Sequence, residues 1–530
     1  MRPLLRSLEF PRFTPWTHSR RALSTLIEGE RYWKDTPWKD VSAEEFTSYR
    51  WQVRNTVTDK HKLYKFLSEA LPEELGPSTN PLLRKITHKE AFIEDAVAAT
   101  KLAPMAIRIT PHVLSRIDWN NPLDDPIRKQ FIPLASCIIP DHEHLKLDSL
   151  EEEKDSPVPG LVCRYPGRAL FLATSICPVY CRFCTRSYAV GGGTDTVTKR
   201  PQKPSLTRWE KVFEYVENCK DLKDIVVSGG DAYYLQPEDL LRMGRRLLHM
   251  DNIERVRFAS KGLAVAPGRI CEGDPWTEAL IELSNLGRSL GKQVCLHTHI
   301  NHPREITWVT KTAANYLFKH GVIVRNQSVL LKGVNNDPVI MSDLIQGLSS
   351  INIQPYYVYQ CDMVQGIEDL RTPLQEIIDL DKQLRGTLSG FMMPAFVIDL
   401  PGGGGKRLVS TMESYENGVA TYRAPGLPGA KGSKDYHYHD PQPIPNEAWL
   451  ALREHKEEAL RNGQTLEQVA RAREANKVSE NVFDVVRRTA PNRIFARNRS
   501  EQNTETITTH HLSSLSVKPL TASTHTPTHL

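Results

Sequence analysis

Three closely spaced cysteines are the residues best suited to chemistry in this chain. Cys177, Cys181 and Cys184 lie in the segment CPVYCRFC, with three and then two residues between them. Three thiolates at this spacing can bind three irons of a [4Fe–4S] cluster and leave the fourth iron open to a small molecule. The alternatives are buried structural cysteines or a zinc site, which needs a fourth ligand such as His297. We predict the cluster because the cysteines follow an expected strand and an aromatic residue precedes the last of them.

A lysine that follows four glycines is a second candidate. Lys406 comes directly after Gly402–Gly405. A lysine amine can attack a carbonyl carbon when desolvation or a neighbouring cation lowers its pKa. The spacing alone favours a solvated lysine on a flexible glycine loop, and the spacing of a P-loop is absent.

Two further segments carry polar residues that suit a ligand. The glycines of SGGD, residues 228–231, let the backbone approach a ligand closely, although a tight connection between a strand and a helix also explains them. His297, His299 and His302 resemble a metal site by eye, since His297 and His299 can share one face of a strand. We favour a place in a ligand pocket, or polar packing, over metal binding.

The elements that must position these residues alternate along the middle of the chain. Short apolar runs rich in β-branched or aromatic residues predict strands at Ala169–Ala173, Ile225–Val227, Arg255–Ala259, Val294–His297, Val322–Leu330, Pro355–Gln360 and Phe396–Leu400. Amphipathic stretches predict helices around Trp209–Asn218, Glu238–His249, Thr277–Leu290, Glu305–Phe318, Pro338–Leu348 and Leu374–Leu384. This alternation predicts a parallel sheet with helical crossovers, closed or nearly closed into a barrel.

Polar residues stand where several of these strands end. Cys177 follows the first strand, the SGGD segment follows the second, and Asp399 lies at the end of the last. Barrels of this type place their chemistry at the carboxyl ends of the strands. We therefore expect these residues to lie together.

Length and composition exclude several classes of protein. The 530 residues suggest about three domains, or one large catalytic domain with additions. The formal charge of +5 is too small to indicate nucleic acid as the main partner. No apolar run approaches the ~20 residues that span a bilayer, which argues against a membrane protein. The nine cysteines are too few and too clustered for a disulfide scaffold, so we expect a reducing compartment.

The two ends of the chain differ from its middle. Residues 1–27 contain five arginines and a single acid, which is typical of a mitochondrial transit peptide, with a basic tail as the alternative. The predicted units that follow are an N-terminal helical domain at 28–150, a barrel at 151–425, a C-terminal helical extension at 426–495 and a disordered tail at 496–530. The tail is predicted to be disordered because Thr, Ser and His dominate it.

Sequence blocks from about Ile107 to Ala424 resemble the lysine 2,3-aminomutase family of the radical S-adenosylmethionine superfamily. The blocks are RYPGR (164–168), the cysteine segment through Arg186, SGGDA (228–232), HTHINHP (297–303), NQSVLLKGVN (326–335), PYYVYQCD (355–362) and DLPGGGGK (399–406). Together they are highly specific. With the arginine-rich leader, the chain resembles a eukaryotic-type member.

The resemblance implies an α/β fold, a partial (β/α)6 barrel of the TIM type. It implies three cofactors: a [4Fe–4S] cluster, S-adenosylmethionine and pyridoxal 5′-phosphate. Pyridoxal phosphate would be bonded to Lys406 and held at its phosphate by Arg164 and Arg168. S-adenosylmethionine would be bound by Ser228, Gly229, Gly230, Asp231 and His297. The substrate carboxylate would bind Arg186, and its side-chain ammonium would bind Asp399.

The implied activity is that of an isomerase that moves the α-amino group of L-lysine to the β-carbon. One departure concerns the substrate, because lysine-specific members read Gly-Val-Asn-Asp where this chain reads GVNN at 333–336. Asn336 would then replace a second carboxylate at the substrate ammonium, which weakens charge complementarity for lysine. Aminomutases of arginine, ornithine or glutamate remain alternatives, as does a non-catalytic homologue that binds the iron–sulfur cluster or pyridoxal phosphate.

The expected partners are a free amino acid and an unidentified electron donor, without nucleic acid or membrane. The family's members associate into dimers or larger assemblies, so a homo-oligomer is expected. No cysteine follows Cys361, and we therefore predict no zinc at a C-terminal subunit contact. The expected location is the mitochondrial matrix, or the cytoplasm if the leader is not a transit peptide.

Overall fold

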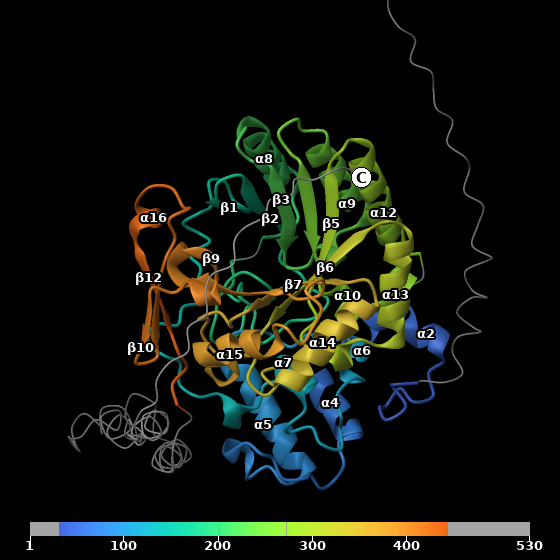
Figure 1. Ribbon diagram of the computed structural model, residues 1–530. Helices are drawn as coiled ribbons and strands as arrows, with labels where there is room; N and C mark the ends of the chain where they lie inside the picture. The colour runs from blue at the N-terminus through green and yellow to red at the C-terminus, as the bar shows by residue number, and fades with distance from the viewer. Residues whose placement is uncertain (1–30, 201, 272, 444–530) are drawn as a thin grey trace, which may run out of the picture. The chain divides into compact units, whose positions relative to one another are not determined.

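A curved sheet of parallel strands forms the centre of the computed structural model, which describes residues 31–443 except 201 and 272 (Figure 1). Its seven parallel strands neighbour one another in chain order: β2 (Arg168–Thr174), β3 (Asp224–Gly229), β4 (Arg255–Ala259), β5 (Gln293–Thr298), β6 (Ile323–Val329), β7 (Gln354–Tyr359) and β8 (Ala395–Leu400). Two antiparallel strands flank them, β1 (Leu161–Tyr165) beside β2 and β9 (Gly405–Leu408) beside β8. Because β1 and β9 do not pair with each other in the described sheet, the barrel has an open seam between them.

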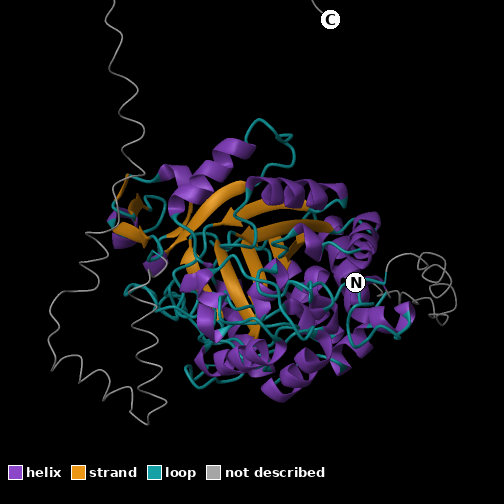
Figure 2. Cartoon of the chain, turned by 90° about the horizontal axis from the view of Figure 1, so that it is seen from below, coloured by secondary structure: helices purple, strands orange, loops and turns teal. Residues whose placement is uncertain are grey.

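Helices connect the parallel strands and cover the outside of the sheet (Figure 2). The connecting helices are α8 (Leu206–Asn218), α9 (Pro237–Leu248), α12 (Pro275–Ser289), α13 (Trp308–Lys319), α14 (Pro338–Ser350) and α15 (Leu374–Leu384), with the short α10 (Gly262–Val265) and α11 (Gly268–Cys271) between β4 and α12. Local chemistry sets where they begin. The Asp337 side chain, for example, accepts hydrogen bonds from the first turn of α14, and Pro338 occupies the first helical position. The predicted α/β partial barrel of six strand–helix units is confirmed, with β8 as a seventh parallel strand.

The segment before the barrel is helical and shares its hydrophobic core. Its helices are α2 (Ala43–Thr47), α3 (Tyr49–Arg54), α4 (Lys60–Ala70), α5 (Lys89–Leu102), α6 (Pro111–Leu114) and α7 (Pro126–Phe131). One cluster of buried apolar side chains runs from Val57 through the barrel strands to Tyr438. The segment predicted as a helical domain at 28–150 therefore packs against the barrel as part of one compact unit.

A small antiparallel sheet follows the barrel. It consists of β10 (Ser414–Glu416), β11 (Val419–Arg423) and β12 (Asp435–His439), and the short α16 (Ala430–Ser433) precedes β12. The expected helical extension from residue 426 is wrong for this stretch, because burial alternates along it as in a strand: Tyr436 and Tyr438 are buried, whereas His437 is exposed.

Several predicted segments lie outside the described residues. These are the leader at 1–27, the rest of the extension beyond residue 443 and the tail at 496–530. No helix among the described residues is long and apolar enough to cross a membrane.

Candidate active site

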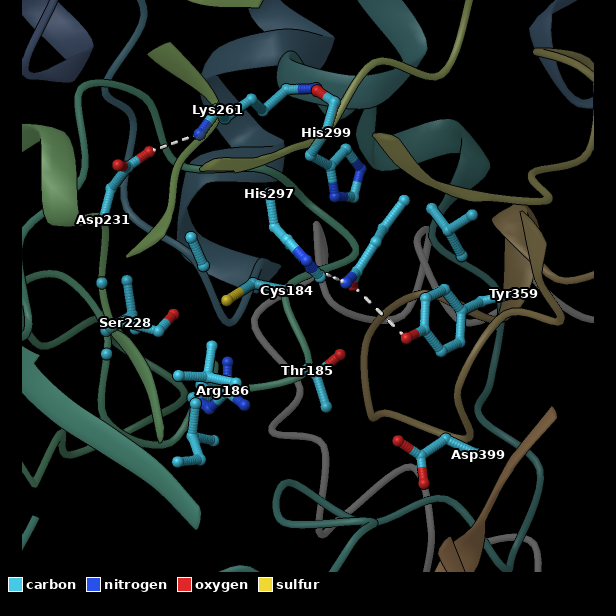
Figure 3. Close-up of a pocket in the computed structure, with 18 of the residues that line it drawn as sticks. Cys184, Thr185, Arg186, Ser228, Asp231, Lys261, His297, His299, Tyr359 and Asp399 are labelled. Carbon is cyan, nitrogen blue, oxygen red and sulfur yellow. Dashed lines mark hydrogen bonds between the residues drawn. The ribbon is translucent and has the colours of Figure 1, made fainter. Parts of the chain in front are cut away.

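A cavity of about 390 Å³ lies inside the barrel and extends to the carboxyl ends of its strands (Figure 3). All the residues predicted for the cluster, for pyridoxal phosphate and for S-adenosylmethionine line it, as do Arg186 and Asp399. Asn336 is the one predicted site residue that does not line it. The cavity has two chemically different ends, which we call the cysteine end and the lysine end.

The cysteine end is a loop after β2 that the N-terminal helical segment holds in place. The backbone N–H of Tyr180 donates to the Arg108 carbonyl at 2.9 Å, and that of Arg182 donates to the Gln130 carbonyl at 3.0 Å. The Arg182 guanidinium also donates to both oxygens of Asp369, at 2.9 and 3.0 Å. Since these bonds fix the backbone between the cysteines, the loop is arranged before any metal binds.

The three thiols of the loop are free and fit a cluster better than a single metal ion. Burial raises the pKa of Cys181 to about 12 and holds that of Cys177 well above its ordinary value, so both thiols stay protonated until a metal displaces the proton. Among the described residues no three His, Cys, Asp or Glu side chains converge on one ion. Zinc requires such convergence, whereas the cysteines of a [4Fe–4S] cluster bind different irons.

The glycines of the SGGD segment line the cavity and also allow the cysteine loop to pack closely against them. Gly229 has φ +116°, and a Cβ there would lie 2.2 Å from the Thr174 carbonyl oxygen. A Cβ on Gly230 would lie 2.4 Å from the Ile176 carbonyl oxygen. Glycine is therefore required because the segment leading into Cys177 packs directly against this turn, and the role of these glycines at S-adenosylmethionine stays a prediction.

At the lysine end, Lys406 forms an ion pair with Asp399. The two residues are partners in the register of β9 and β8, and Lys406 Nζ donates to Asp399 Oδ2 at 2.7 Å. Burial alone would lower the pKa of Lys406, but Asp399 outweighs it and holds that pKa above its ordinary value. The lowered pKa that a nucleophilic lysine needs is therefore absent in this state.

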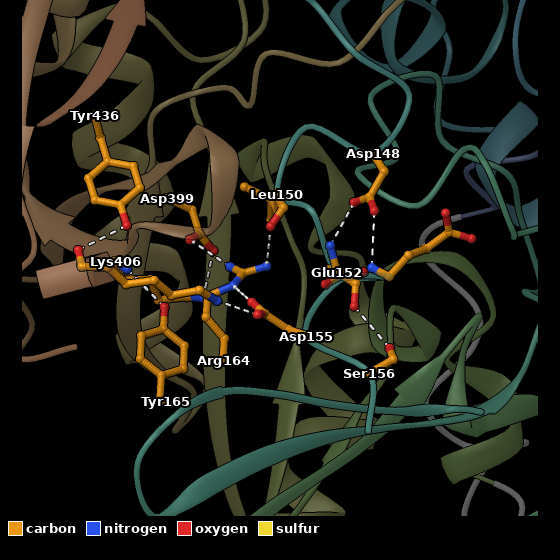
Figure 4. A network of polar contacts seen from close by, with 12 residues as sticks. Asp148, Leu150, Glu152, Asp155, Ser156, Arg164, Tyr165, Asp399, Lys406 and Tyr436 are labelled. Carbon is orange, nitrogen blue, oxygen red and sulfur yellow. Dashed lines mark hydrogen bonds and ion pairs between the residues drawn. The ribbon is translucent and has the colours of Figure 1, made fainter. Parts of the chain in front are cut away.

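Arg164 joins this pair to a longer chain of charges (Figure 4). Its Nη1 donates to Asp399 Oδ1 at 3.1 Å, its Nη2 donates to the Leu150 carbonyl at 3.0 Å, and its Nε lies 3.5 Å from Asp155 Oδ2. Asp155 also pairs with Lys431 of α16. We call the series Lys431–Asp155–Arg164–Asp399–Lys406 the seam chain, because it bridges the open side of the barrel with alternating charges. Both terminal nitrogens of Arg164 donate hydrogen bonds, whereas its Nε is buried without a hydrogen-bond partner in the described structure, so its role at a phosphate stays a prediction.

Other cations of the cavity are better placed for an anionic cofactor. Arg168 is exposed and stacks on the Tyr165 ring at 3.9 Å. Arg257 donates through Nε to Asp224 at 2.8 Å, and its terminal nitrogens have no acceptor among the described residues. Burial and, to a lesser extent, the positive charge of Arg257 lower the pKa of His297 to about 3. His297 Nε2 is buried without a partner in the described structure. An excess of guanidinium groups beside unpartnered nitrogen fits a phosphate dianion.

Arg186 is already bonded to a carboxylate that the sequence did not reveal. Glu152 accepts from its Nε and Nη2, both at 2.8 Å, and also from the Tyr188 hydroxyl at 3.0 Å. Burial raises the pKa of Glu152, but Arg186 outweighs this and leaves it below its ordinary value. Glu152 was missed because it lies in a loop before β1, far from Arg186 in sequence, and no local signal marks it.

Asn336 does not line the cavity, and Asp362 provides the second carboxyl group of the lysine end instead. Asn336 accepts a hydrogen bond from the Gly333 N–H at 2.7 Å and donates to Glu376 at 3.0 Å, so it stabilises a loop after β6, outside the cavity. Asp362 does line the cavity, and the Thr185 hydroxyl donates to it at 2.6 Å. Burial, followed by Asp399, raises the pKa of Asp362 to about 7. Its position after β7 could have indicated it, since active sites of barrels follow strand ends.

Comparisons with known proteins find relatives that align over most of this chain. The chain is 36% identical over 400 residues to the L-lysine 2,3-aminomutase of Clostridium subterminale, covering 73% of this chain and 86% of the relative. It is 36% identical over 407 residues to that of Acetoanaerobium sticklandii, covering 74% and 88%. It is 30% identical over 364 residues to the glutamate 2,3-aminomutase of Clostridioides difficile, covering 68% and 76%.

Similar solved structures align over about half of the chain. Streptococcus suis SuiB bound to S-adenosylmethionine aligns with a TM-score of 0.33 and 12% identity, covering 44% of this chain and 51% of that one. A radical SAM methyltransferase from Sphaerobacter thermophilus aligns with a TM-score of 0.29 and 17% identity, covering 45% and 68%. A scan against models of protein families finds no match.

Proposed function

The chain belongs to the lysine 2,3-aminomutase family, and on this basis we propose that it moves the α-amino group of an amino acid, L-lysine first, to the neighbouring β-carbon. Its cofactors are a [4Fe–4S] cluster, S-adenosylmethionine and pyridoxal phosphate. When bound, they supply an adenosyl radical that removes the β-hydrogen and an imine that delocalises the resulting radical. The protein's task is to bind, orient and shield these groups.

One observation carries the proposal: the three cysteines and Lys406 line a single cavity. The cysteine loop would hold the cluster, with one iron facing the cavity. Lys406 would hold pyridoxal phosphate, and the guanidinium groups of Arg168 and Arg257 would hold its phosphate. Both sets of residues would thus hold their cofactors in one cavity, which would bring a substrate at the lysine end within reach of the chemistry supplied at the cysteine end.

The remaining charges of the cavity would orient the substrate. Arg186 would bind its α-carboxylate through donors not used by Glu152. Asp399 and Asp362 would bind a side-chain ammonium, because Asp399 is buried, Asp362 is half-buried and both line the same cavity. Two carboxylates favour lysine, ornithine or arginine over glutamate, whose side-chain carboxylate would meet like charges.

An anaerobic competition assay tests this proposal. The full-length protein, with its cluster rebuilt and with S-adenosylmethionine, pyridoxal phosphate and a reductant, is offered lysine, ornithine, arginine and glutamate together. We expect β-lysine as the main product and no β-glutamate. The absence of any β-amino acid would contradict the proposal, and β-glutamate as the main product would contradict the substrate assignment.

We also propose that this is a eukaryotic-type member whose residues 1–27 direct it to the mitochondrial matrix. Five arginines against one acid in those residues support this. Fusion of residues 1–27 to a fluorescent protein should bring it to mitochondria, and replacing the five arginines by glutamine should abolish the import. Uniform cytoplasmic fluorescence of the first fusion would contradict the proposal. We further propose that an external one-electron donor reduces the cluster and that the chain associates into dimers or larger assemblies.

A further inference from the structure

The carboxylate of Asp399 has two partners to serve, the Lys406 ammonium and the proposed substrate ammonium. Lys406 Nζ lies 2.7 Å from Asp399 Oδ2, and the register of β9 and β8 fixes this pair. Asp399 is only 7% exposed, so it must have a cationic partner to remain charged. The side chain that would bond to pyridoxal phosphate is therefore also the cation that neutralises the carboxylate for the substrate ammonium.

We propose that, in the protein without pyridoxal phosphate, the Lys406 ammonium occupies the place on Asp399 that a substrate ammonium takes once Lys406 is bonded to the cofactor. The inference rests on the proposed function and deepens it, because it couples cofactor loading to recognition of a cationic amino acid. In the protein without the cofactor, the Lys406 ammonium thus makes the contact that the substrate's side-chain ammonium would make.

Bonding of Lys406 to the aldehyde removes this ammonium. The nitrogen forms a double bond to the aldehyde carbon, and the aldehyde oxygen leaves as water with two of the ammonium protons. The third proton goes to solvent, and nothing is oxidised or reduced. After this step Asp399 has lost its closest cation.

The charges that remain around Asp399 do not replace the lost one. Arg164 still donates to it at 3.1 Å, but the same guanidinium faces Asp155. Asp362 lines the same cavity and adds a second carboxyl group. A buried Asp399 that shares its guanidinium with Asp155, with the half-buried Asp362 in the same cavity, favours the entry of a further cation, because an uncompensated buried charge is costly.

The consequence is that the cavity discriminates in favour of an ammonium only when it is loaded. Without the cofactor, a substrate ammonium must compete with a lysine that the sheet holds in place. When Lys406 is bonded to the cofactor, Asp399 can pair with the substrate ammonium. Coupling of this kind is reciprocal, so a bound ammonium also strengthens the binding of pyridoxal phosphate.

Calorimetry with two ligands tests the coupling on the full-length protein with its cluster rebuilt and without S-adenosylmethionine. The ligands are 6-aminohexanoate and hexanoate, which differ only in the ammonium group. Without pyridoxal phosphate, we expect the wild type to bind both within about twofold and Lys406→Met to prefer 6-aminohexanoate at least tenfold. The wild type with pyridoxal phosphate restored should gain the same preference, and borohydride trapping should show the cofactor still on Lys406.

Matched variants exclude a general effect of removing a positive charge. Lys431→Met removes another lysine of the seam chain and should behave like the wild type. Lys406→Met combined with Asp399→Asn should lose the preference, and Lys406→Gln replaces Lys406→Met if the latter does not fold. A tenfold preference in the unloaded wild type, or no preference in a folded Lys406 variant, would overturn the inference. If only the proposed function is wrong, no β-amino acid forms although the ammonium preference is intact.

Discussion

The cysteine end of the cavity comes from a single loop, whereas the lysine end is assembled from segments far apart in the sequence. The three cysteines lie within eight consecutive residues. The seam chain joins the loop before β1, β1 itself, β8, β9 and α16. The cysteine end can therefore be identified from spacing, but the lysine end exists only when the barrel has folded.

The two ends also differ in how their charges are balanced. The thiols of the cysteine end have pKa values raised mainly by burial, so this end is neutral until a metal binds. At the lysine end, cations and carboxylates already neutralise one another. The comparison indicates that the cysteine end can bind its cofactor without breaking an ion pair. At the lysine end, an existing ion pair must break before a ligand can bind.

The largest expected effect is the loss of the cofactor at the cysteine end while the lysine end still binds its own. Cys181→Ala should abolish the cluster, because two remaining thiolates cannot hold it, and turnover should fall to background. Pyridoxal phosphate should still bond to Lys406, since the seam chain does not contain Cys181. Iron analysis, visible absorption and borohydride trapping measure these outcomes on the same sample.

A matched cysteine variant controls for handling of the protein. Cys219→Ala removes a free cysteine next to α8 and outside the cavity, and should leave iron content unchanged. If Cys181→Ala retained full cluster absorption, the assignment of the cysteine end would be wrong.

The next effect concerns the lysine end and its stability. Asp399→Asn leaves the buried Arg164 and the half-buried Lys406 without their shared carboxylate, and we expect a loss of about 3–5 kcal/mol in the free energy of unfolding. Chemical denaturation monitored by circular dichroism measures it. The surface variant Asp379→Asn breaks an exposed pair with Lys382 and should change stability by less than about 1 kcal/mol. Equal effects of the two variants would contradict the description of the seam chain.

A smaller effect depends on pH. Arg186 keeps the pKa of Glu152 below its ordinary value of 4.5, although burial opposes this. The ionised carboxylate therefore contributes stability that is fully present above that value and is lost as the pH falls through the lowered pKa. Glu152→Gln should cost about 1–3 kcal/mol at neutral pH, and its difference from the wild type should shrink below about pH 4. Denaturation curves between pH 3 and pH 7 check this, and a constant difference would contradict it.

The smallest effect tests a single hydroxyl. Tyr188→Phe removes the donor that lies 3.0 Å from Glu152, and we expect a loss of about 0.5–1.5 kcal/mol without loss of the cluster. Tyr64→Phe is the control, because that side chain is 57% exposed. Identical melting temperatures for the two variants would show that the hydroxyl of Tyr188 contributes nothing.

The sequence predicts the barrel because its signals are local. The apolar run Ile225–Val227 lies inside β3, and Leu374–Leu384 coincides with α15. Each signal depends on neighbouring residues and on a helical or strand period. β12 was missed because Tyr436 and Tyr438 alternate over too short a stretch to outweigh the helical composition that follows.

The site was predictable only where its residues act alone. Cys177 and Lys406 were found from their own segments and from the resemblance that these carry. Glu152 and Asp155 were missed, and the pairing of Arg164 with Asp399 was not expected, because these contacts depend on pairings across the open side of the barrel. Such pairings follow from the fold and have no signature in the spacing of residues.

One labelling experiment tests the central claim most directly, namely that both ends of the cavity act on one substrate. L-lysine carrying ¹⁵N only at its α-nitrogen is incubated anaerobically with the full-length protein, all three cofactors and a reductant. We predict β-lysine in which the label is bonded to the β-carbon, with no label released as ammonia. Lysine recovered unchanged, or label found in free ammonia, would contradict the claim.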